Sequence, residues 1–345
     1  MKATTWLLCL TGVYALVLVT ISVLNRMGPD FFWLGALNLY LPQVMWAVPG
    51  LILFLAFFKL DRSWMWLPLL CVLWVLGPLM GFSWSLPAPK SATAGLTIRV
   101  MTWNVKYGRY DIAALLEELT RHTPDVVLLQ DAPGSMRGPL KYHFREWHTR
   151  SFGQYVIASK YPLFDAEVHE LPSSSHREEN FLRCRMRIGS ELISLYNVHF
   201  KTPRRSLNAF RTARRQPWYL PEAINYFDRN VRLRLVQAAT MVEHLNAEQG
   251  PVIVAGDLNA PEASLVCATL REAGLRDAFS EGGTGYGFTY GHLLLKNRLP
   301  WLRISWMRID HIMLNSRFTT QRAWTGSGQA SDHRPVIADL VLNYP

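Results

Sequence analysis

Three long stretches without a charged residue fill the first quarter of this 345-residue chain and constrain its folding more than any other feature. They cover residues 4–24, 31–58 and 63–84. A helix needs about 20 apolar residues to cross the hydrocarbon core of a bilayer, which is roughly 30 Å thick. Each stretch reaches that length, so the sequence predicts three transmembrane helices. A cleaved signal peptide is the alternative for the first stretch, although no small-residue cleavage pattern follows it near Asn25.

The few charges around these stretches predict an orientation. Lys2, Lys59 and Arg62 lie on one side of the predicted helices, whereas Arg26 and Lys90 lie near the other. Short loops that carry Lys and Arg usually face the cytoplasm, and this favours the cytoplasm for the N-terminus and for the turn at 59–62. We therefore expect an integral membrane protein with three spans. Its C-terminal part is expected in the periplasm or outside the cell, on a bacterial inner or plasma membrane.

The composition changes sharply after residue 84. Residues 85–95 are rich in Pro, Ala and Ser and lack an apolar period, so they are expected to form a linker. The expected domains are thus a membrane anchor at 1–84, this linker and a catalytic domain at 96–345. Residues 84–345 carry 32 basic and 24 acidic residues, a net charge of +8. Such a surface attracts phosphate-bearing partners, either nucleic acid or anionic lipid.

Short β-rich runs alternate with helical patterns throughout the C-terminal part. Strands are predicted at 96–105, 126–130, 155–159, 181–188, 192–199, 252–255, 309–314, 319–324 and 335–342. Helices are predicted at 112–121, 231–245 and 263–273. Strands and helices interleaved over about 250 residues predict a layered α/β domain, with a sheet core and helices outside.

Polar side chains follow several of these strands. Asp131 follows the strand at 126–130, while Asp257 and Asn259 follow the strand at 252–255 with a spacing that points both to one side. The other candidates at strand ends are Asn104, His199, Asp310, Asp332 and His333. Taken singly, most of these residues would be turn or surface residues. Together they supply what cleavage of a phosphate ester requires, namely ligands for a hard divalent cation, a group that activates water and donors to phosphate.

The order of these segments resembles the endonuclease/exonuclease/phosphatase superfamily. The resemblance covers residues 97–343 and rests on the series Trp-Asn-Val, Leu-Gln-Asp, Ala-Ser-Lys-Tyr-Pro, Asn-Val-His, Gly-Asp-Leu-Asn, Arg-Ile-Asp-His and Ser-Asp-His-Arg-Pro-Val. It implies a two-sheet α/β sandwich and a metal-dependent phosphoric ester hydrolase. The superfamily contains deoxyribonucleases, inositol-polyphosphate phosphatases and neutral sphingomyelinases.

The same resemblance implies a role for each candidate. It places Asn104, Asp131 and Asp332 around Mg²⁺, with Mn²⁺ or Ca²⁺ as alternatives. Asp257 would activate or align the water, Asn259 would hold phosphate, His199 and His333 would contact phosphate, and Asp310 would support His333. One departure is visible, because the superfamily usually has Glu where this chain has Asp131. Water-mediated ligation or an altered metal preference would accommodate the shorter side chain.

A basic and aromatic segment after His199 is expected to bind substrate at the rim of the site. Its candidate residues are Arg204, Arg205, Arg211, Arg214, Arg215 and Trp218. Arginines interspersed with aromatic residues suit lipid headgroups at an interface and equally suit single-stranded nucleic acid. A solvated helical face is the alternative without a function.

The anchor favours one class of substrate. A short tether raises the effective concentration of a substrate in the same membrane. We therefore expect a membrane-anchored phosphoesterase that hydrolyses a phosphate ester or pyrophosphate of a membrane lipid. Resemblance to a branch of the superfamily with a similar three-span anchor implies polyprenyl pyrophosphate as a specific candidate. The alternatives are a membrane-tethered extracellular nuclease and a non-catalytic protein that binds phosphate or lipid.

Overall fold

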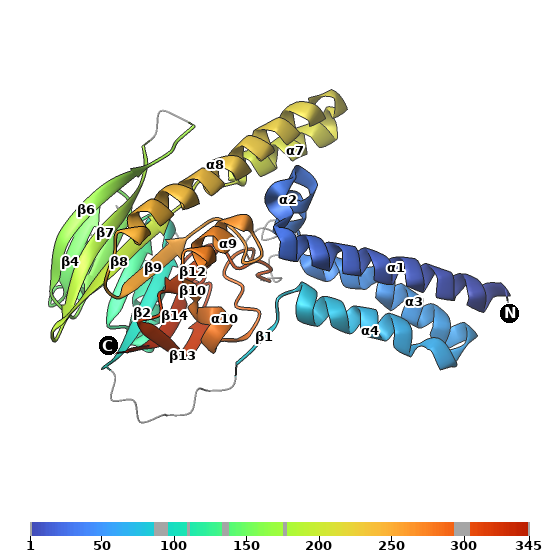
Figure 1. Cartoon of the computed structure of the whole chain (residues 1–345), viewed down its shortest axis with the longest axis horizontal. Coiled ribbons are helices and arrows are strands. Elements are labelled where there is room, and N and C mark those ends of the chain that lie inside the picture. The colour runs from blue at the N-terminus through green and yellow to red at the C-terminus, as the bar shows by residue number, and fades with distance from the viewer. Residues whose placement is uncertain are drawn as a thin grey trace. The chain divides into compact units, whose positions relative to one another are not determined.

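The computed structural model describes residues 2–85, 96–108, 111–132, 138–174, 178–292 and 304–343, and most of the expected linker lies outside these ranges. The chain divides into two compact units, Met1–Ser83 and Trp84–Pro345. Figure 1 shows a helical N-terminal unit and a C-terminal unit built on sheets. Each unit is described separately below.

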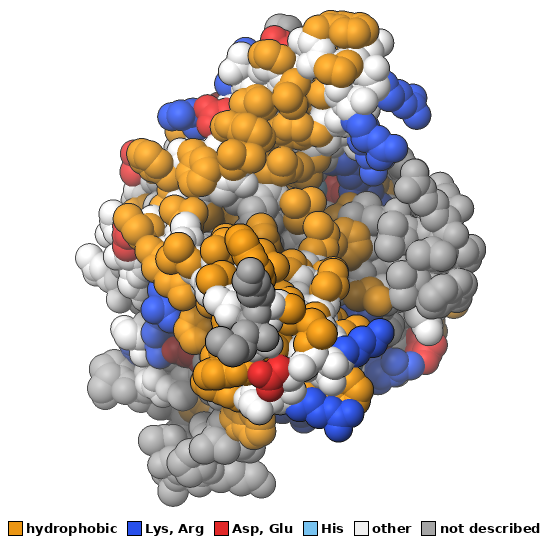
Figure 2. Space-filling model, turned by 90° about the vertical axis from the view of Figure 1, so that its right-hand side faces the viewer, with side chains coloured by type: hydrophobic (Ala, Val, Ile, Leu, Met, Phe, Trp, Pro, Cys, Tyr) orange, Lys and Arg blue, Asp and Glu red, His pale blue; other side chains and the backbone are white. Residues whose placement is uncertain are grey.

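The N-terminal unit contains three helical stretches that are long and apolar enough to cross a membrane. These stretches are Ala3–Met27, Gln43–Leu60 and Arg62–Leu79. They pack on one another through Tyr14, Leu18, Leu53 and Val72, while many of their other apolar side chains are exposed. Hydrophobic side chains cover much of the face of the molecule that Figure 2 shows, which is the right-hand side of Figure 1. The elements of this unit are α1 (Lys2–Met27), η1 (Pro29–Phe31), α2 (Trp33–Tyr40), η2 (Gln43–Trp46), α3 (Ala47–Leu60), η3 (Arg62–Trp64), α4 (Trp66–Trp74) and η4 (Val75–Leu79).

The prediction of a single helix over residues 31–58 is wrong at its N-terminal end. The short helix α2 stops at Tyr40, and Leu41 is extended with φ −84° and ψ 151°. Pro42 explains the break, because proline disfavours helical backbone in the residue before it. The helix long enough to span a membrane therefore begins only at Gln43.

The C-terminal unit contains two six-stranded sheets. The first has the order β13-β14-β2-β3-β5-β4, and the second has the order β10-β12-β9-β8-β7-β6. Within them only β2/β3 and β8/β9 pair in parallel. The strands of the first sheet are β2 (Leu96–Asn104), β3 (Val126–Gln130), β4 (His148–Phe152), β5 (Tyr155–Ser159), β13 (Phe318–Thr325) and β14 (Val336–Leu342). Those of the second are β6 (Leu163–Leu171), β7 (Glu179–Ile188), β8 (Glu191–His199), β9 (Val252–Asp257), β10 (Arg276–Asp277) and β12 (Asp310–Leu314).

The two sheets pack face to face, and helices cover their outer faces. Ile98, Val100 and Leu128 of the first sheet join Ile253 and Ile312 of the second in one buried cluster. A second cluster joins the outer face of the first sheet to α5, and a third joins the outer face of the second sheet to α8 and α9. This is the expected two-sheet α/β sandwich. The helical elements of this unit are η5 (Lys106–Gly108), α5 (Ile112–His122), α6 (Pro139–His143), α7 (Arg204–Arg215), η6 (Pro217–Tyr219), α8 (Leu220–Asn246), α9 (Leu265–Glu272) and α10 (Ala278–Gly282). The two-residue strands β1 (Ser83–Trp84) and β11 (Thr284–Gly285) lie outside both large sheets.

The inner faces of the sheets become polar at one end, and this change positions the site. Side chains alternate between the two faces of a strand, so every second residue points into the layer between the sheets. In β2 this series begins with Ile98 and Val100 and ends with Asn104, whereas in β9 it begins with Ile253 and ends with Asp257. The hydrophobic layer thus stops where the polar side chains of both sheets meet.

The strands β4 and β6 and the helix α7 are among the elements of this unit that were not predicted from the sequence. Each of the strands β4 and β6 forms one edge of its sheet and is largely exposed, so they lack a buried apolar alternation. The helix α7 buries only Ser206, Ala209 and Ala213. Small residues of this kind produce almost no apolar periodicity, so the pattern did not reveal the helix.

Candidate active site

Strand register places three of the predicted residues side by side. His199 of β8 is paired with Asp257 of β9, and Asp257 is paired in turn with Asp310 of β12. Asn104 approaches this row from the other sheet and donates from Nδ2 to Asp257 Oδ2 at 3.0 Å. Residues more than 200 positions apart thus converge because both sheets end at the same edge.

Asp257 lies at the centre of the cluster and is 1% exposed. Its Oδ2 lies 3.5 Å from His199 Nε2 and 3.7 Å from His333 Nε2. Its Oδ1 accepts a hydrogen bond of 2.9 Å from the backbone N–H of Asn259. Burial, and then the nearby carboxylate of Asp310, raise the pKa of Asp257, although the two histidines oppose the rise. A carboxylate in these surroundings is a stronger base than one in water, which suits a group that takes a proton from water.

His333 and Asp310 form a buried pair. His333 Nδ1 lies 2.9 Å from Asp310 Oδ2 and 3.1 Å from Oδ1. Burial disfavours the protonated ring, but the carboxylates of Asp310 and Asp257 outweigh it and raise the pKa of His333 to about 9. The ring is therefore an imidazolium at neutral pH, and its Nε2 side faces Asp257. A cation held there can donate to a phosphate oxygen.

Asp131 lies just beyond β3, next to Lys106 and His199. Lys106 Nζ lies 3.2 Å from Asp131 Oδ2, and His199 Nδ1 lies 3.7 Å from Oδ1. Burial raises the pKa of Asp131, but His199 and Lys106 outweigh it, so the pKa lies below the ordinary value. Asp131 therefore stays ionised at neutral pH. The residue has a positive φ of 50°, a conformation that Asp adopts more readily than most residues.

Asp332 lies on the loop before β14, where Arg204 covers it. Arg204 Nη2 lies 3.3 Å from Asp332 Oδ2 and 3.4 Å from the hydroxyl of Tyr290. The other carboxylate oxygen, Oδ1, is buried and has no hydrogen-bond partner among the described residues. A buried carboxylate oxygen without a partner is costly unless a cation or water completes it.

The oxygen donors fit a hard divalent cation. Asp257, Asp310 and His333 offer ligand atoms within 4.8 Å of one another, but a protonated His333 has no lone pair to give. Asn104, Asp131 and Asp332 offer oxygen atoms, which Mg²⁺ and Ca²⁺ prefer. The partnerless Asp332 Oδ1 is the atom in this set whose surroundings best fit a bound cation.

Asn259 lies two residues after Asp257, in a left-handed backbone conformation. It has a positive φ of 49°, and its Nδ2 donates to the backbone oxygen of Phe200 at 2.9 Å. Gly256, on the other side of Asp257, has φ 153°, and a Cβ atom there would lie 1.9 Å from the backbone oxygen of Val198. Glycine at this position lets β8 and β9 approach closely beside the His199–Asp257 pair.

The predicted substrate-binding residues lie at different distances along α7. Arg204, at its first turn, contacts the cluster through Asp332. Arg205 is also in that turn, whereas Arg211, Arg214 and Arg215 lie two to three turns further on, and Trp218 follows in η6. A helix rises 1.5 Å per residue, so the last arginines lie about 15 Å along the helix from Arg204.

Several residues of the site were missed from the sequence. Lys106 binds Asp131, Tyr290 contacts Arg204, and Gln154 Oε1 accepts a hydrogen bond of 2.8 Å from His199 Nδ1. Gln130 and Asn197 link the two sheets through a hydrogen bond of 2.7 Å. Lys106 stands two residues after Asn104, the same spacing as Asp257 and Asn259, and that was the one available signal. Nothing local in the sequence distinguishes the others.

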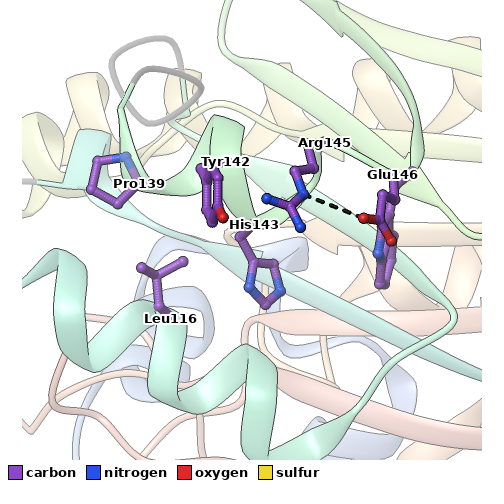
Figure 3. Close-up of a pocket in the computed structure, with 7 residues that line it drawn as sticks. Leu116, Pro139, Tyr142, His143, Arg145 and Glu146 are labelled. Carbon is purple, nitrogen blue, oxygen red and sulfur yellow. Dashed lines mark hydrogen bonds and ion pairs between the residues drawn. The ribbon is translucent and has the colours of Figure 1, made fainter.

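A separate pocket of about 350 Å³ lies beside α5 and α6. Its wall carries the ion pair of Arg145 and Glu146, with Leu116, Tyr142 and His143 around it (Figure 3). None of its lining residues belongs to the polar cluster, so this pocket is not the candidate active site.

Comparison with known proteins agrees with this architecture. Residues 101–333 match the model of the Endonuclease/Exonuclease/phosphatase family. An endonuclease/exonuclease/phosphatase from Bacteroides vulgatus has a similar structure, with 17% identity and a TM-score of 0.55 over 72% of this chain and 100% of its own. Truncated TDP2 from Caenorhabditis elegans has 16% identity and a TM-score of 0.52 over 71% of this chain and 98% of its own.

A third similar structure is an endonuclease/exonuclease/phosphatase from Beutenbergia cavernae. It has 17% identity and a TM-score of 0.52, and the match covers 72% of each chain. At these identities the structural likeness shows the fold alone. The comparison with curated proteins found no match.

Proposed function

Because this chain belongs to the endonuclease/exonuclease/phosphatase family of metal-dependent phosphoesterases and nucleases, we propose that it hydrolyses a phosphate ester or pyrophosphate of a membrane lipid. Polyprenyl pyrophosphate is the specific candidate. The observation that carries the hydrolytic part is the row of His199, Asp257 and Asp310, with His333 closing it from the loop before β14.

Asn104, Asp131 and Asp332 would hold Mg²⁺, with Mn²⁺ or Ca²⁺ as alternatives. When bound, the cation neutralises phosphate charge and stabilises the charge that develops during cleavage. The ionised state of Asp131 and the partnerless oxygen of Asp332 support this assignment.

The remaining catalytic roles fall to side chains of this protein. Asp257 takes a proton from the attacking water as its oxygen bonds to phosphorus, while the bond from phosphorus to the leaving oxygen breaks. Asn104 orients the Asp257 carboxylate through the hydrogen bond at 3.0 Å. Imidazolium His333, held by Asp310, donates to a phosphate oxygen, and Asn259 provides a second polar contact. His199, which lies near both Asp257 and Asp131, would contact phosphate or protonate the leaving oxygen.

The N-terminal helices support the proposal that the substrate is a lipid. Three of them are long and apolar enough to cross a membrane, so the catalytic domain would share a membrane with its substrate. Arg204 would contact a substrate phosphate in the site, and its contact with Asp332 supports this role. The charges near the helix ends favour an external catalytic domain, and protease accessibility in intact cells against inverted vesicles tests that orientation.

The test is phosphate or headgroup release by the purified full chain in liposomes, with Mg²⁺ or with EDTA. Polyprenyl pyrophosphate, common phospholipids and DNA are offered separately. Asp257→Asn keeps the shape of the side chain but removes the base, so kcat should fall at least about 10²-fold. Asp165→Asn is the matched control, since Asp165 is an exposed carboxylate on β6.

Metal-dependent lipid turnover that fails in Asp257→Asn and persists in Asp165→Asn supports the proposal. Cleavage of DNA without lipid turnover would indicate a membrane-tethered nuclease. Metal binding without turnover of any substrate would indicate the non-catalytic phosphate- or lipid-binding protein.

A further inference from the structure

The helices α7 and α8 form a hairpin whose far end carries no catalytic residue. They pack on each other through Ala209, Ala213 and Ala223, and the rings of Phe210 and Phe227 meet edge to face at 5.7 Å. The C-terminal part of α8 packs on the second sheet. Its N-terminal part extends with α7 beyond that sheet (Figure 1). We call the segment from Arg211 to Tyr226 the hairpin tip.

Basic charge without acidic neighbours is concentrated on α7. The helix has 12 residues, among them five arginines and no Asp or Glu. Arg205, Arg211, Arg214 and Arg215 are exposed, and none has a carboxylate within 4.0 Å in the described part of the chain. On α8 the situation differs, because Arg229 pairs with Glu222 and Arg232 pairs with Asp228. The unpaired charge therefore lies on the α7 side of the hairpin.

Large apolar side chains are exposed at the same tip. Trp218 is 78% exposed, Leu220 is 42% exposed and Tyr226 is 36% exposed. The tip forms the uppermost part of Figures 1 and 2, where hydrophobic side chains have Lys and Arg side chains beside them. Exposed Trp and Tyr flanked by arginine suit the interface of an anionic membrane, where the ring enters the headgroup layer and the guanidinium groups meet phosphates.

We propose that the hairpin tip is a docking surface for an anionic lipid bilayer, separate from the catalytic cluster. The short segment that joins the last candidate membrane span to the catalytic domain favours a bilayer over other anionic partners. Only 16 residues separate Leu79, the end of the last candidate span, from Leu96, where β2 begins. Even when extended, a segment of that length reaches only about 50 Å, so the tip meets a membrane surface at high effective concentration.

Docking would also constrain the catalytic domain. The helix α7 runs from Arg204, which contacts Asp332, to the tip itself. Contact of the tip with lipid headgroups would therefore hold the first turn of α7, and the edge of the site with it, at a set distance from the membrane.

The test uses the full chain in nanodiscs, with a fluorophore on Gln216→Cys at the tip. The background carries Cys9→Ala and Cys71→Ala, while Cys184 and Cys267 remain because both are buried. Lipids with a quencher at the headgroup level should quench the fluorophore in discs that contain anionic lipid, and much less in purely zwitterionic discs. The same fluorophore on Ser151→Cys, an exposed residue of the edge strand β4, is the positional control.

Two sets of variants test whether docking of the hairpin tip depends on its unpaired basic charge. Replacement of Arg211, Arg214 and Arg215 by Gln should lower the docking equilibrium constant roughly 100-fold, at about fivefold for each basic residue near an anionic surface. Joint replacement of Asp228 by Asn and Arg232 by Gln should change it little, because these two charges form an ion pair and their removal together leaves the net charge unchanged. Equal quenching in both kinds of disc, or quenching unaffected by the triple replacement, would overturn the proposal. Quenching absent from all discs, with a fluorescence change on adding oligonucleotide, would indicate nucleic acid as the partner instead.

Discussion

Replacement of Gly256 by Ala should damage the site without changing any group that takes part in the chemistry. Gly256 is paired with Val198 across the parallel strands β8 and β9, immediately before the pair of His199 and Asp257. A Cβ atom on Gly256 would lie 1.9 Å from the backbone oxygen of Val198, whereas ordinary contact begins at 3.4 Å. Because the obstacle is backbone, the two strands must separate by about 1.5 Å for the methyl group to fit.

The magnitude follows from two contributions. A non-glycine residue forced into a glycine-type conformation at φ 153° costs about 1–3 kcal/mol. An extra methyl group in a packed interior costs a further 1–3 kcal/mol or so. The free energy of unfolding should therefore fall by about 2–6 kcal/mol, and Tm should fall by on the order of 10 °C for a domain of this size. Displacement of Asp257 by about 1 Å should lower kcat about 10²-fold.

Thermal unfolding followed by near-UV circular dichroism, together with kcat at a temperature where the variant remains folded, measures both effects. The matched control is Gly189→Ala in the turn between β7 and β8. Gly189 also has a positive φ, 59°, but no atom lies within 4 Å of its Cβ position. This control carries only the backbone cost of about 1–2 kcal/mol and should keep wild-type kcat.

The reasoning fails if Gly256→Ala is no less stable than Gly189→Ala. It fails equally if Gly256→Ala loses stability but keeps full kcat at a permissive temperature, because the close approach of the strands would then not position Asp257.

Three further predictions concern the proposed metal ligands and a buried acid away from the site. Asp131→Asn should lose nearly all turnover and weaken Mg²⁺ binding measured by calorimetry, since the charge held between Lys106 and His199 disappears; full activity with Mg²⁺ would show that the metal assignment is wrong. EDTA should abolish turnover, and added Mg²⁺ or Mn²⁺ should restore it, whereas turnover that survives exhaustive chelation would exclude the proposed metal chemistry. Glu118→Gln should lower stability by about 1–3 kcal/mol at pH 7, because this buried carboxylate accepts hydrogen bonds from Ser327. Burial raises the pKa of Glu118, but hydrogen bonds from His122 and Ser327 outweigh it, so the folded-state pKa lies below 4.5. The stability that the carboxylate contributes is therefore present above pH 4.5 and is lost as the pH falls through the lower folded-state pKa. Urea titrations of the wild-type protein and of Glu118→Gln between about pH 3 and 7 measure their free energies of unfolding. These free energies should converge at acidic pH, and a difference that stays constant with pH would refute the linkage.

The central strands were predictable because each carries its own signal. Val126–Gln130 and Tyr155–Ser159 have the bounds expected from the sequence. Both are fully buried, so nearly every residue in them is apolar or small. Edge strands such as β4 face water and have no such constraint. The same logic explains why α7, which buries only small residues, escaped prediction.

For the candidate site too, the sequence predicts some features and only the structure shows the others. The types of its residues and their order along the chain are properties of the sequence, and they are sufficient to single out Asp257, Asp310 and His333 as candidates. The contacts of these residues are long-range, as between Asn104 and Asp257 or between Arg204 and Asp332. No local pattern encodes such distances, because they depend on how two sheets pack and where their strands end.

By itself, the sequence determined three apolar stretches, an α/β pattern and a set of acids, amides and imidazoles at strand ends. These are local properties, since hydrophobic length and periodicity are set by neighbouring residues. Only the tertiary structure decided that Lys106 lies on Asp131, that His333 is held as a cation between Asp310 and Asp257, and that Trp218 lies at an exposed tip. The physical reason is that charge state and exposure depend on what surrounds a group in space, and that environment is built from parts of the chain far apart in sequence.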